Sequence, residues 1–162
     1  MKRIILFTIL FLSVLGTNAQ IKKAKLQASG LTCSMCNLSI LKSLQKLPFV
    51  EKVESNVETA TYEIEFKPTA EFSMLDVQRA VVDAGFSVAM LTFEVQPQKI
   101  AKYSTSQFTF SNVTYHIVDG GFDLATDVLN FQVIDKGFLP EKKYKKYKGK
   151  IVASNGLNII KI

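Results

Sequence analysis

The stretch Gly30-Leu31-Thr32-Cys33-Ser34-Met35-Cys36 separates two patterns of apolar residues. Residues 22–30 alternate between apolar and polar side chains, which is the pattern of a β-strand with one solvated face. From Asn37 onward the apolar residues recur at helical spacing, until Pro48 ends the run. This change of period predicts a strand, a turn and a helix, with both cysteines where the turn meets the helix.

The residues that follow predict four more elements. Alternation and β-forming residues favour strands over 50–57, 62–66 and 86–95, while apolar residues at helical spacing favour a helix over 74–84, which Gly85 ends. The order is therefore β-α-β-β-α-β. Two such halves fold as a ferredoxin-like antiparallel sheet of four strands with both helices on one face, so the fold class is α+β.

The remaining part of the chain predicts a small, mostly β domain over 95–162. Residues 21–94 carry a net charge of −1 and residues 95–162 a net charge of +5, and the change falls at Gln96-Pro97-Gln98. We therefore expect one domain over 20–94 and a second over 95–162. Strands are expected over 108–110, 113–118 and 128–134. The segments 151–153 and 157–162 are expected to form a hairpin around Ser154-Asn155-Gly156. No long helical period stands out.

Residues 1–19 have the layout of a signal peptide. Lys2 and Arg3 precede an apolar run over 4–15, and Thr17-Asn18-Ala19 supplies small residues at the positions that a signal peptidase reads. A transmembrane anchor is the alternative, but the run is shorter than the roughly 18 to 20 residues that a span needs. We expect a periplasmic or secreted protein that begins near Gln20.

The two cysteines are the candidate metal ligands. The chain of 162 residues holds two cysteines, which is too few for a disulfide scaffold, and its one histidine, His116, cannot supply a polyhistidine site. Cys33 and Cys36 would both lie near a helix N-terminus, where the helix dipole lowers thiol pKa values. Two thiolates suit Cu(I), whereas structural zinc normally takes four ligands.

The motif, in this place, resembles that of the heavy-metal-associated domain of proteins that handle copper and mercury. That family carries Gly-Met-Thr-Cys-x-x-Cys at the end of its first strand. The match extends to the apolar pattern of the first helix over 40–47 and to Ala84-Gly85-Phe86 after the second. The resemblance covers residues 21–94 and implies a ferredoxin-like fold that binds a soft metal through Cys33 and Cys36.

Four positions are compared with the family pattern. Leu31 replaces the family methionine and is expected to keep the packing beneath the loop. Phe49 replaces a family glycine, which we interpret as a surface change. Phe86 occupies the family position that faces the metal and is expected to shield it. Met35 is expected to point outward, as a solvent-side or partner-contact residue, with a direct thioether ligand role as the alternative.

The leading hypothesis is therefore an exported metallochaperone or metal-trafficking protein, not an enzyme. It would carry Cu(I), with Hg(II), Zn(II) and Cd(II) as other metals, and would pass it to a metal-transport or metal-accepting partner by ligand exchange. The same Cys-x-x-Cys pair could instead serve thiol–disulfide exchange or form an inert disulfide. In a third hypothesis the β domain carries the function.

One further surface is singled out by charge. Lysines interleave with Tyr144 and Tyr147 over 142–150. A plain solvated face is the favoured interpretation of these lysines. The alternative is a binding surface, and because export argues against nucleic acid, its partner would be an acidic protein or an anionic membrane.

Overall fold

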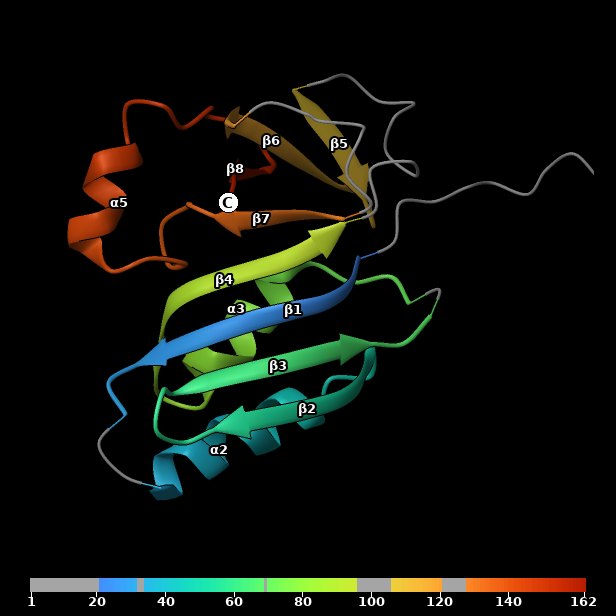
Figure 1. The fold of residues 1–162 in the computed structure, drawn as a ribbon, viewed down its shortest axis with the longest axis vertical. Coiled ribbons are helices and arrows are strands. Elements are labelled where there is room, and N and C mark those ends of the chain that lie inside the picture. The colour runs from blue at the N-terminus through green and yellow to red at the C-terminus, as the bar shows by residue number, and fades with distance from the viewer. Residues whose placement is uncertain (1–20, 32–33, 69, 96–105, 121–127) are drawn as a thin grey trace, which may run out of the picture.

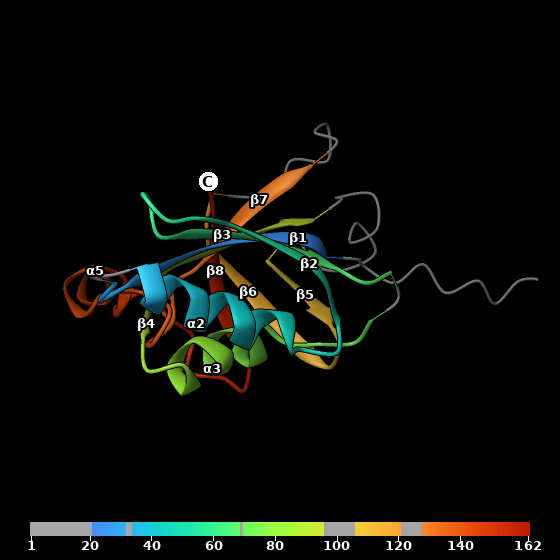
Figure 2. The ribbon, with the colours of Figure 1, turned by 90° about the horizontal axis from the view of Figure 1, so that it is seen from below.

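The computed structural model describes residues 21–31, 34–68, 70–95, 106–120 and 128–162. Its first half has the predicted order of elements: β1 (Ile21–Ser29), α2 (Ser34–Gln45), β2 (Val50–Asn56), β3 (Thr61–Phe66), α3 (Met74–Asp83) and β4 (Ser87–Val95). The four strands pair antiparallel in the order β2-β3-β1-β4. Both helices lie on one face of this sheet (Figure 2). The ferredoxin-like prediction is confirmed.

The core forms where the predicted apolar faces meet. Leu26 of β1, Ile40 and Leu44 of α2, and Val77 and Val81 of α3 are each fully buried. Their spacing along the chain is two residues in the strand and three or four in the helices, so each element turns one apolar stripe toward the sheet–helix interface. Burial of these stripes holds α2 and α3 against the sheet.

Two local signals fix the ends of α3. The Ser73 side chain accepts a hydrogen bond from the backbone N–H of Leu75 at 3.1 Å, and the Asp76 carboxylate accepts one from the backbone N–H of Ser73 at 3.1 Å. This is a capping box. At the other end Gly85 has φ +89°, and the N–H groups of Gly85 and Phe86 donate to the carbonyls of Val82 and Val81. That pattern is a Schellman motif, as the predicted stop at Gly85 requires.

The second half adds strands to the same sheet. It contains β5 (Gln107–Phe110), β6 (Val113–Asp119), β7 (Leu129–Val133), α5 (Glu141–Tyr147) and β8 (Leu157–Lys161). The sheet has eight strands in the order β2-β3-β1-β4-β7-β8-β6-β5 (Figure 1). The first three strands of this half agree with the predicted ranges.

The two halves are joined at β4. Residues Thr92–Val95 of β4 pair antiparallel with β7, so the sheet edge that a lone ferredoxin-like domain would expose is covered. The expected boundary at Gln96-Pro97-Gln98 lies outside the described residues. A separate second domain over 95–162 stays a prediction.

Aromatic side chains form much of the shared core. Phe93 of β4 contacts Tyr115 of β6 edge-on, with ring centroids 5.4 Å apart, and Tyr115 stacks on Phe108 of β5 at 5.1 Å. Phe72, just before α3, contacts Phe110 of β5 at 5.0 Å. Most buried residues of both halves belong to one cluster, while Ile134, Leu139 and Ile160 form a second, smaller one.

The interpretation of Phe49 as a surface residue is wrong. Its ring is partly buried and stacks on Phe72, with centroids 4.9 Å apart and planes 12° from parallel. It also lies 6.2 Å from Phe66. The aromatic partners come from separate parts of the chain, so the local pattern around Pro48 does not indicate them.

The hairpin expected over 151–162 is also wrong. Residues 151–153 are not a strand, and β8 pairs parallel with β6 and antiparallel with β7. The backbone N–H of Val152 donates to Asn158 Oδ1 at 2.8 Å, and Asn158 Nδ2 donates to the Val152 carbonyl at 3.2 Å. The Asn158 side chain therefore forms the hydrogen bonds with the Val152 backbone that a partner strand would form in a hairpin.

The short helix α5 was not predicted. Only Tyr144 and Tyr147 of this helix, together with Ile151 after it, pack against the buried residues, and lysines surround them in the sequence. No long helical period is therefore visible in the sequence. Among the residues described, no helix is long and apolar enough to cross a membrane.

Candidate metal centre

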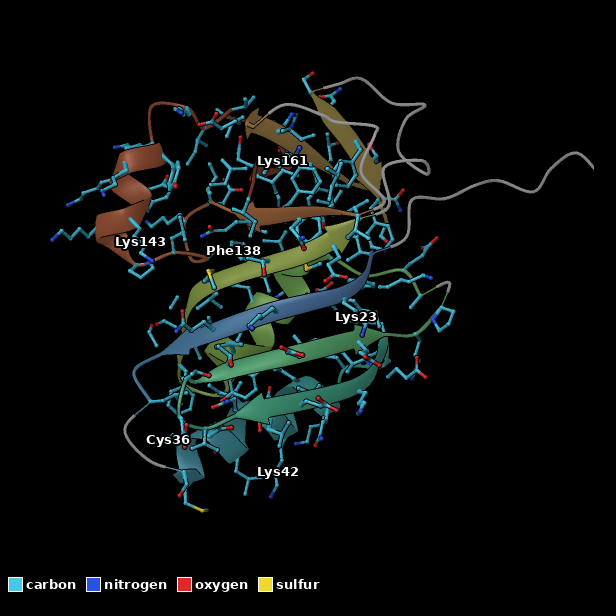
Figure 3. All side chains as sticks on the ribbon, in the orientation of Figure 1. Lys23, Cys36, Lys42, Phe138, Lys143 and Lys161 are labelled. Carbon is cyan, nitrogen blue, oxygen red and sulfur yellow. The ribbon has the colours of Figure 1, made fainter. Side chains whose placement is uncertain are left out.

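The metal-binding loop of the prediction begins where β1 ends. Gly30 follows β1 with φ +85°, a conformation that glycine adopts at little cost, and Leu31 packs against the core. Thr32 and Cys33 lie outside the described residues. The helix α2 begins at Ser34, so Cys36 lies in its first turn, as predicted (Figure 3). The packing of Leu31 confirms its expected role beneath the loop.

The first turn of α2 favours negative charge. It contains no acidic side chain, and the Cys36 side chain is half-buried there. The positive end of a helix dipole stabilises an anion in the first turn, and a thiolate is such an anion. This position therefore suits a sulfur ligand that binds as thiolate.

Met35 lies on the outside of the same turn. It is 69% exposed, the largest exposure among the large hydrophobic residues of the described chain. Its carbonyl accepts a hydrogen bond from the Ser39 hydroxyl at 3.1 Å. The exposure agrees with the expected outward orientation.

Asn37 and Tyr62 form a buried polar pair beneath the first turn of α2, called here the polar floor, which the sequence analysis did not predict. Asn37 is 4% exposed and Tyr62 is fully buried, and the Tyr62 hydroxyl donates to the Asn37 carbonyl at 3.4 Å. Burial, with a smaller contribution from the nearby Cys36, raises the pKa of Tyr62 to about 12. Tyr62 thus stays protonated, and it places a neutral hydroxyl beneath the turn that carries Cys36.

The signal for this floor was present but weak. Asn37 precedes Ile40 by three residues and Leu44 by seven, so it heads the buried stripe of α2. An asparagine at that place is an anomaly that the spacing could have revealed. Its Nδ2 has no hydrogen-bond acceptor among the described residues.

Phe86 is held at the end of α3 by the Schellman motif. Its ring is partly buried and packs against the core. Its predicted role as a shield of the metal stays a prediction, because Cys33 and Thr32 lie outside the described residues.

The donors in the described residues do not form a closed site. No group of three or more His, Cys, Asp or Glu side chains in the described ranges could hold a metal ion. His116 lies on β6, where its Nε2 and the Ser154 hydroxyl are 2.7 Å apart. The arrangement leaves the two thiols as the predicted ligands, which is a set for a soft metal of low coordination number.

Comparison with known proteins assigns the first half to a family. The family model of the heavy-metal-associated domain matches residues 25–87. These residues include the Cys33–Cys36 motif, both helices and the turn at Gly85. The chain belongs to the heavy-metal-associated domain family. The family model ends at the start of β4, so the strands β5 to β8 lie beyond it.

Solved structures that resemble this chain are heavy-metal-associated domains. The oxidised MerP of Ralstonia metallidurans CH34 is 31% identical, with 43% of this chain and 97% of that one covered and a TM-score of 0.39. The Cu(I)-loaded N-terminal domain of a potential copper-translocating P-type ATPase from Bacillus subtilis is 30% identical, with 43% and 85% covered and a TM-score of 0.38. A yeast copper transporter domain is 25% identical, with 40% and 88% covered and a TM-score of 0.37. The comparison with curated proteins gives no match.

Proposed function

We propose that this protein binds Cu(I) through the thiolates of Cys33 and Cys36 and passes it to a partner. The observation that carries the proposal is the position of Cys36 in the first turn of α2, three residues after Cys33 in a heavy-metal-associated domain. The solved relatives include a yeast copper transporter domain and a domain of a potential copper-translocating P-type ATPase. Two thiolates on a helix N-terminus form a soft, low-coordinate donor set, which suits Cu(I) better than zinc.

Transfer would proceed by ligand exchange. A partner thiolate adds to the bound Cu(I), and one bond from the metal to a cysteine sulfur of this chain then breaks. A second partner ligand then replaces the remaining cysteine sulfur in the same way, which leaves both cysteines of this chain as thiolates. No electron is transferred and the metal is never released as a bare ion. The exposed Met35 next to the half-buried Cys36 supports access of a partner to the first turn of α2. The partner would be a metal-transport or metal-accepting protein.

Export is part of the proposal. The basic start, the apolar run over 4–15 and the small residues over 17–19 support cleavage before Gln20 and a periplasmic or secreted location. N-terminal sequencing of the protein isolated from its host should begin near Gln20. Recovery of Met1 at the N-terminus would contradict export by this route.

The metal site is tested by titration of the reduced protein with Cu(I) against a competing Cu(I) chelator. We expect one Cu(I) per chain, and we expect Cys33→Ser and Cys36→Ser each to lose it. The matched control is Ser34→Ala, which changes an exposed residue of the same loop and should bind as the parent does.

A different result would favour the redox alternative. If the parent protein fails to compete with the chelator but reduces the disulfides of insulin, the Cys-x-x-Cys pair acts in thiol–disulfide exchange and the metal proposal fails. Equal Cu(I) binding by the parent and both cysteine variants would also refute it, because the metal would then lie elsewhere.

A further inference from the structure

The helix α5 carries an unneutralised lysine surface. Five exposed lysines belong to it, four in the helix and one at its C-terminal cap: Lys142, Lys143, Lys145, Lys146 and Lys148. In the described part of the chain none of the five forms an ion pair. The nearby Lys150 differs, because Asp119 pairs with it at 2.6 Å. The only acidic residue of the helix is Glu141.

The two tyrosines of α5 do not belong to this surface. Tyr144 and Tyr147 pack, with Ile151, against the buried cluster of Ile134, Leu139 and Ile160. Their spacing of three residues places them on one side of the helix. The aromatic rings therefore fix α5 to the sheet, and the exposed side chains of the helix are its lysines and Glu141.

This composition favours a lipid surface over a protein. Specific protein interfaces are poor in lysine and depend on buried aromatic or arginine anchors, and here the aromatic residues face inward. Attraction to an anionic lipid surface requires only positive charge, and each lysine near such a surface strengthens binding about fivefold. The exposed lysines of α5 are therefore sufficient for a purely electrostatic contact with lipid.

The position of α5 connects it with the metal-binding end of the molecule. The strands β1 and β7 both run antiparallel to β4, so they point in the same direction. The chain leaves β1 toward Cys36 and leaves β7 toward α5, and both therefore lie at the same end of the strands (Figure 1). A membrane surface in contact with α5 would therefore lie at the same end of the strands as Cys36.

We propose that the lysine surface of α5 holds this protein on membranes rich in anionic lipid. The contact is electrostatic and peripheral, because the tyrosines are not available to enter the lipid. The contact does not depend on bound metal, so failure of this proposal would not affect the function proposed for Cys33 and Cys36.

The test is co-sedimentation of the proposed mature protein, residues 20–162, with vesicles of phosphatidylcholine that contain 30% phosphatidylglycerol. We expect binding at low salt, loss of binding in 0.5 M salt and no binding to pure phosphatidylcholine, because salt screens charges at this range. The variant Lys142→Gln/Lys145→Gln/Lys146→Gln should bind at least tenfold more weakly. Glutamine preserves helix propensity, and circular dichroism and Cu(I) binding should match those of the parent.

The control variant removes the same charge elsewhere. Lys22, Lys42 and Lys46 are exposed and form no ion pair among the described residues, so Lys22→Gln/Lys42→Gln/Lys46→Gln should keep nearly all binding. Equal losses in the two variants would overturn the proposal, since net charge and not α5 would be responsible. Absence of binding to the anionic vesicles, combined with α5-dependent binding of poly-glutamate, would also overturn it in favour of an acidic protein partner.

Discussion

Gly85 shows how one residue sets the geometry where α3 turns into β4, next to the end of β1. It ends α3 in a left-handed conformation, and that turn directs the chain so that Phe86 packs against the core. A Cβ at this position would meet no atom within 4 Å. Any cost of substitution is therefore conformational and not steric.

The variant Gly85→Ala should lose about 1 kcal/mol of unfolding free energy, because alanine disfavours φ +89°. The matched control is Gly149→Ala, where a Cβ also meets nothing within 4 Å and φ is not positive. We expect it to change stability by less than about 0.5 kcal/mol. Urea unfolding of both variants measures the difference. Equal effects would mean that the conformation of Gly85 carries no cost.

Tyr115 makes stability depend on alkaline pH. Burial raises its pKa above the ordinary value of 10.0, outweighing the opposite effect of the nearby Met74 backbone. A group whose pKa is higher in the folded state contributes stability that is complete below the unfolded pKa and is lost as pH rises through the folded pKa. Its contribution is therefore complete below about pH 10 and declines above it.

The variant Tyr115→Phe lacks this titration. We expect its free energy of unfolding to fall less steeply than that of the parent between pH 9 and pH 11.5, as measured by urea unfolding across that range. Tyr62 remains in the variant and titrates late for the same reason, so part of the decline persists. Parallel curves for the two proteins would show that ionisation of Tyr115 does not contribute.

The residues of the candidate site differ in how well the sequence predicted their roles. Cys33 and Cys36 were predicted because their spacing is local and their chemistry distinctive. Tyr62 was identified only as a strand residue, since its contact with Asn37 joins positions 25 apart. Contacts of that kind depend on the packing of β3 against α2, which no local pattern specifies.

Among the elements, α3 has the best-defined ends. Its capping box satisfies backbone N–H groups that would otherwise have no partner. The variant Ser73→Ala should lose about 1 kcal/mol of unfolding free energy because that bond disappears.

Ser39→Ala is the matched control for this change. The Ser39 hydroxyl bonds back to the Met35 carbonyl within α2, an interaction that adds little to helix stability. Alanine has the higher helix propensity, so we expect no loss in that variant. Thermal unfolding of both proteins provides the measurement. A loss in Ser39→Ala as large as that in Ser73→Ala would contradict the assigned role of the cap.

The elements of the first half were predictable because their periods are long and clear. The alternation over 23–29 in β1 and the helical spacing over the ten residues of α3 each specify one type of structure. The C-terminal strand β8 was found, but its partners were not. It pairs parallel with β6, some forty residues earlier in the chain, and such a partner is a property of the sheet and not of the strand.

At the scale of the whole molecule, the eight strands share one sheet and one buried cluster. Phe131 of β7 lies at their junction, fully buried, with its ring 6.0 Å from both Phe93 and Phe108. We expect the chain to unfold as one cooperative unit. The two-domain division at Gln96–Gln98 predicts instead that the two halves unfold separately.

Phe131→Ala distinguishes these outcomes. Loss of a buried phenylalanine costs about 3–5 kcal/mol, and in one cooperative unit that loss reaches every strand. Hydrogen exchange followed by mass spectrometry should show β1 and β8 losing protection together, while Val152→Ala, at a site 47% exposed, leaves both unchanged. If β8 loses protection and β1 keeps it, the strands beyond β4 form a separate unit that docks on an independently stable heavy-metal-associated domain. The pairing of β4 with β7 would then be an interface between domains and not part of one core.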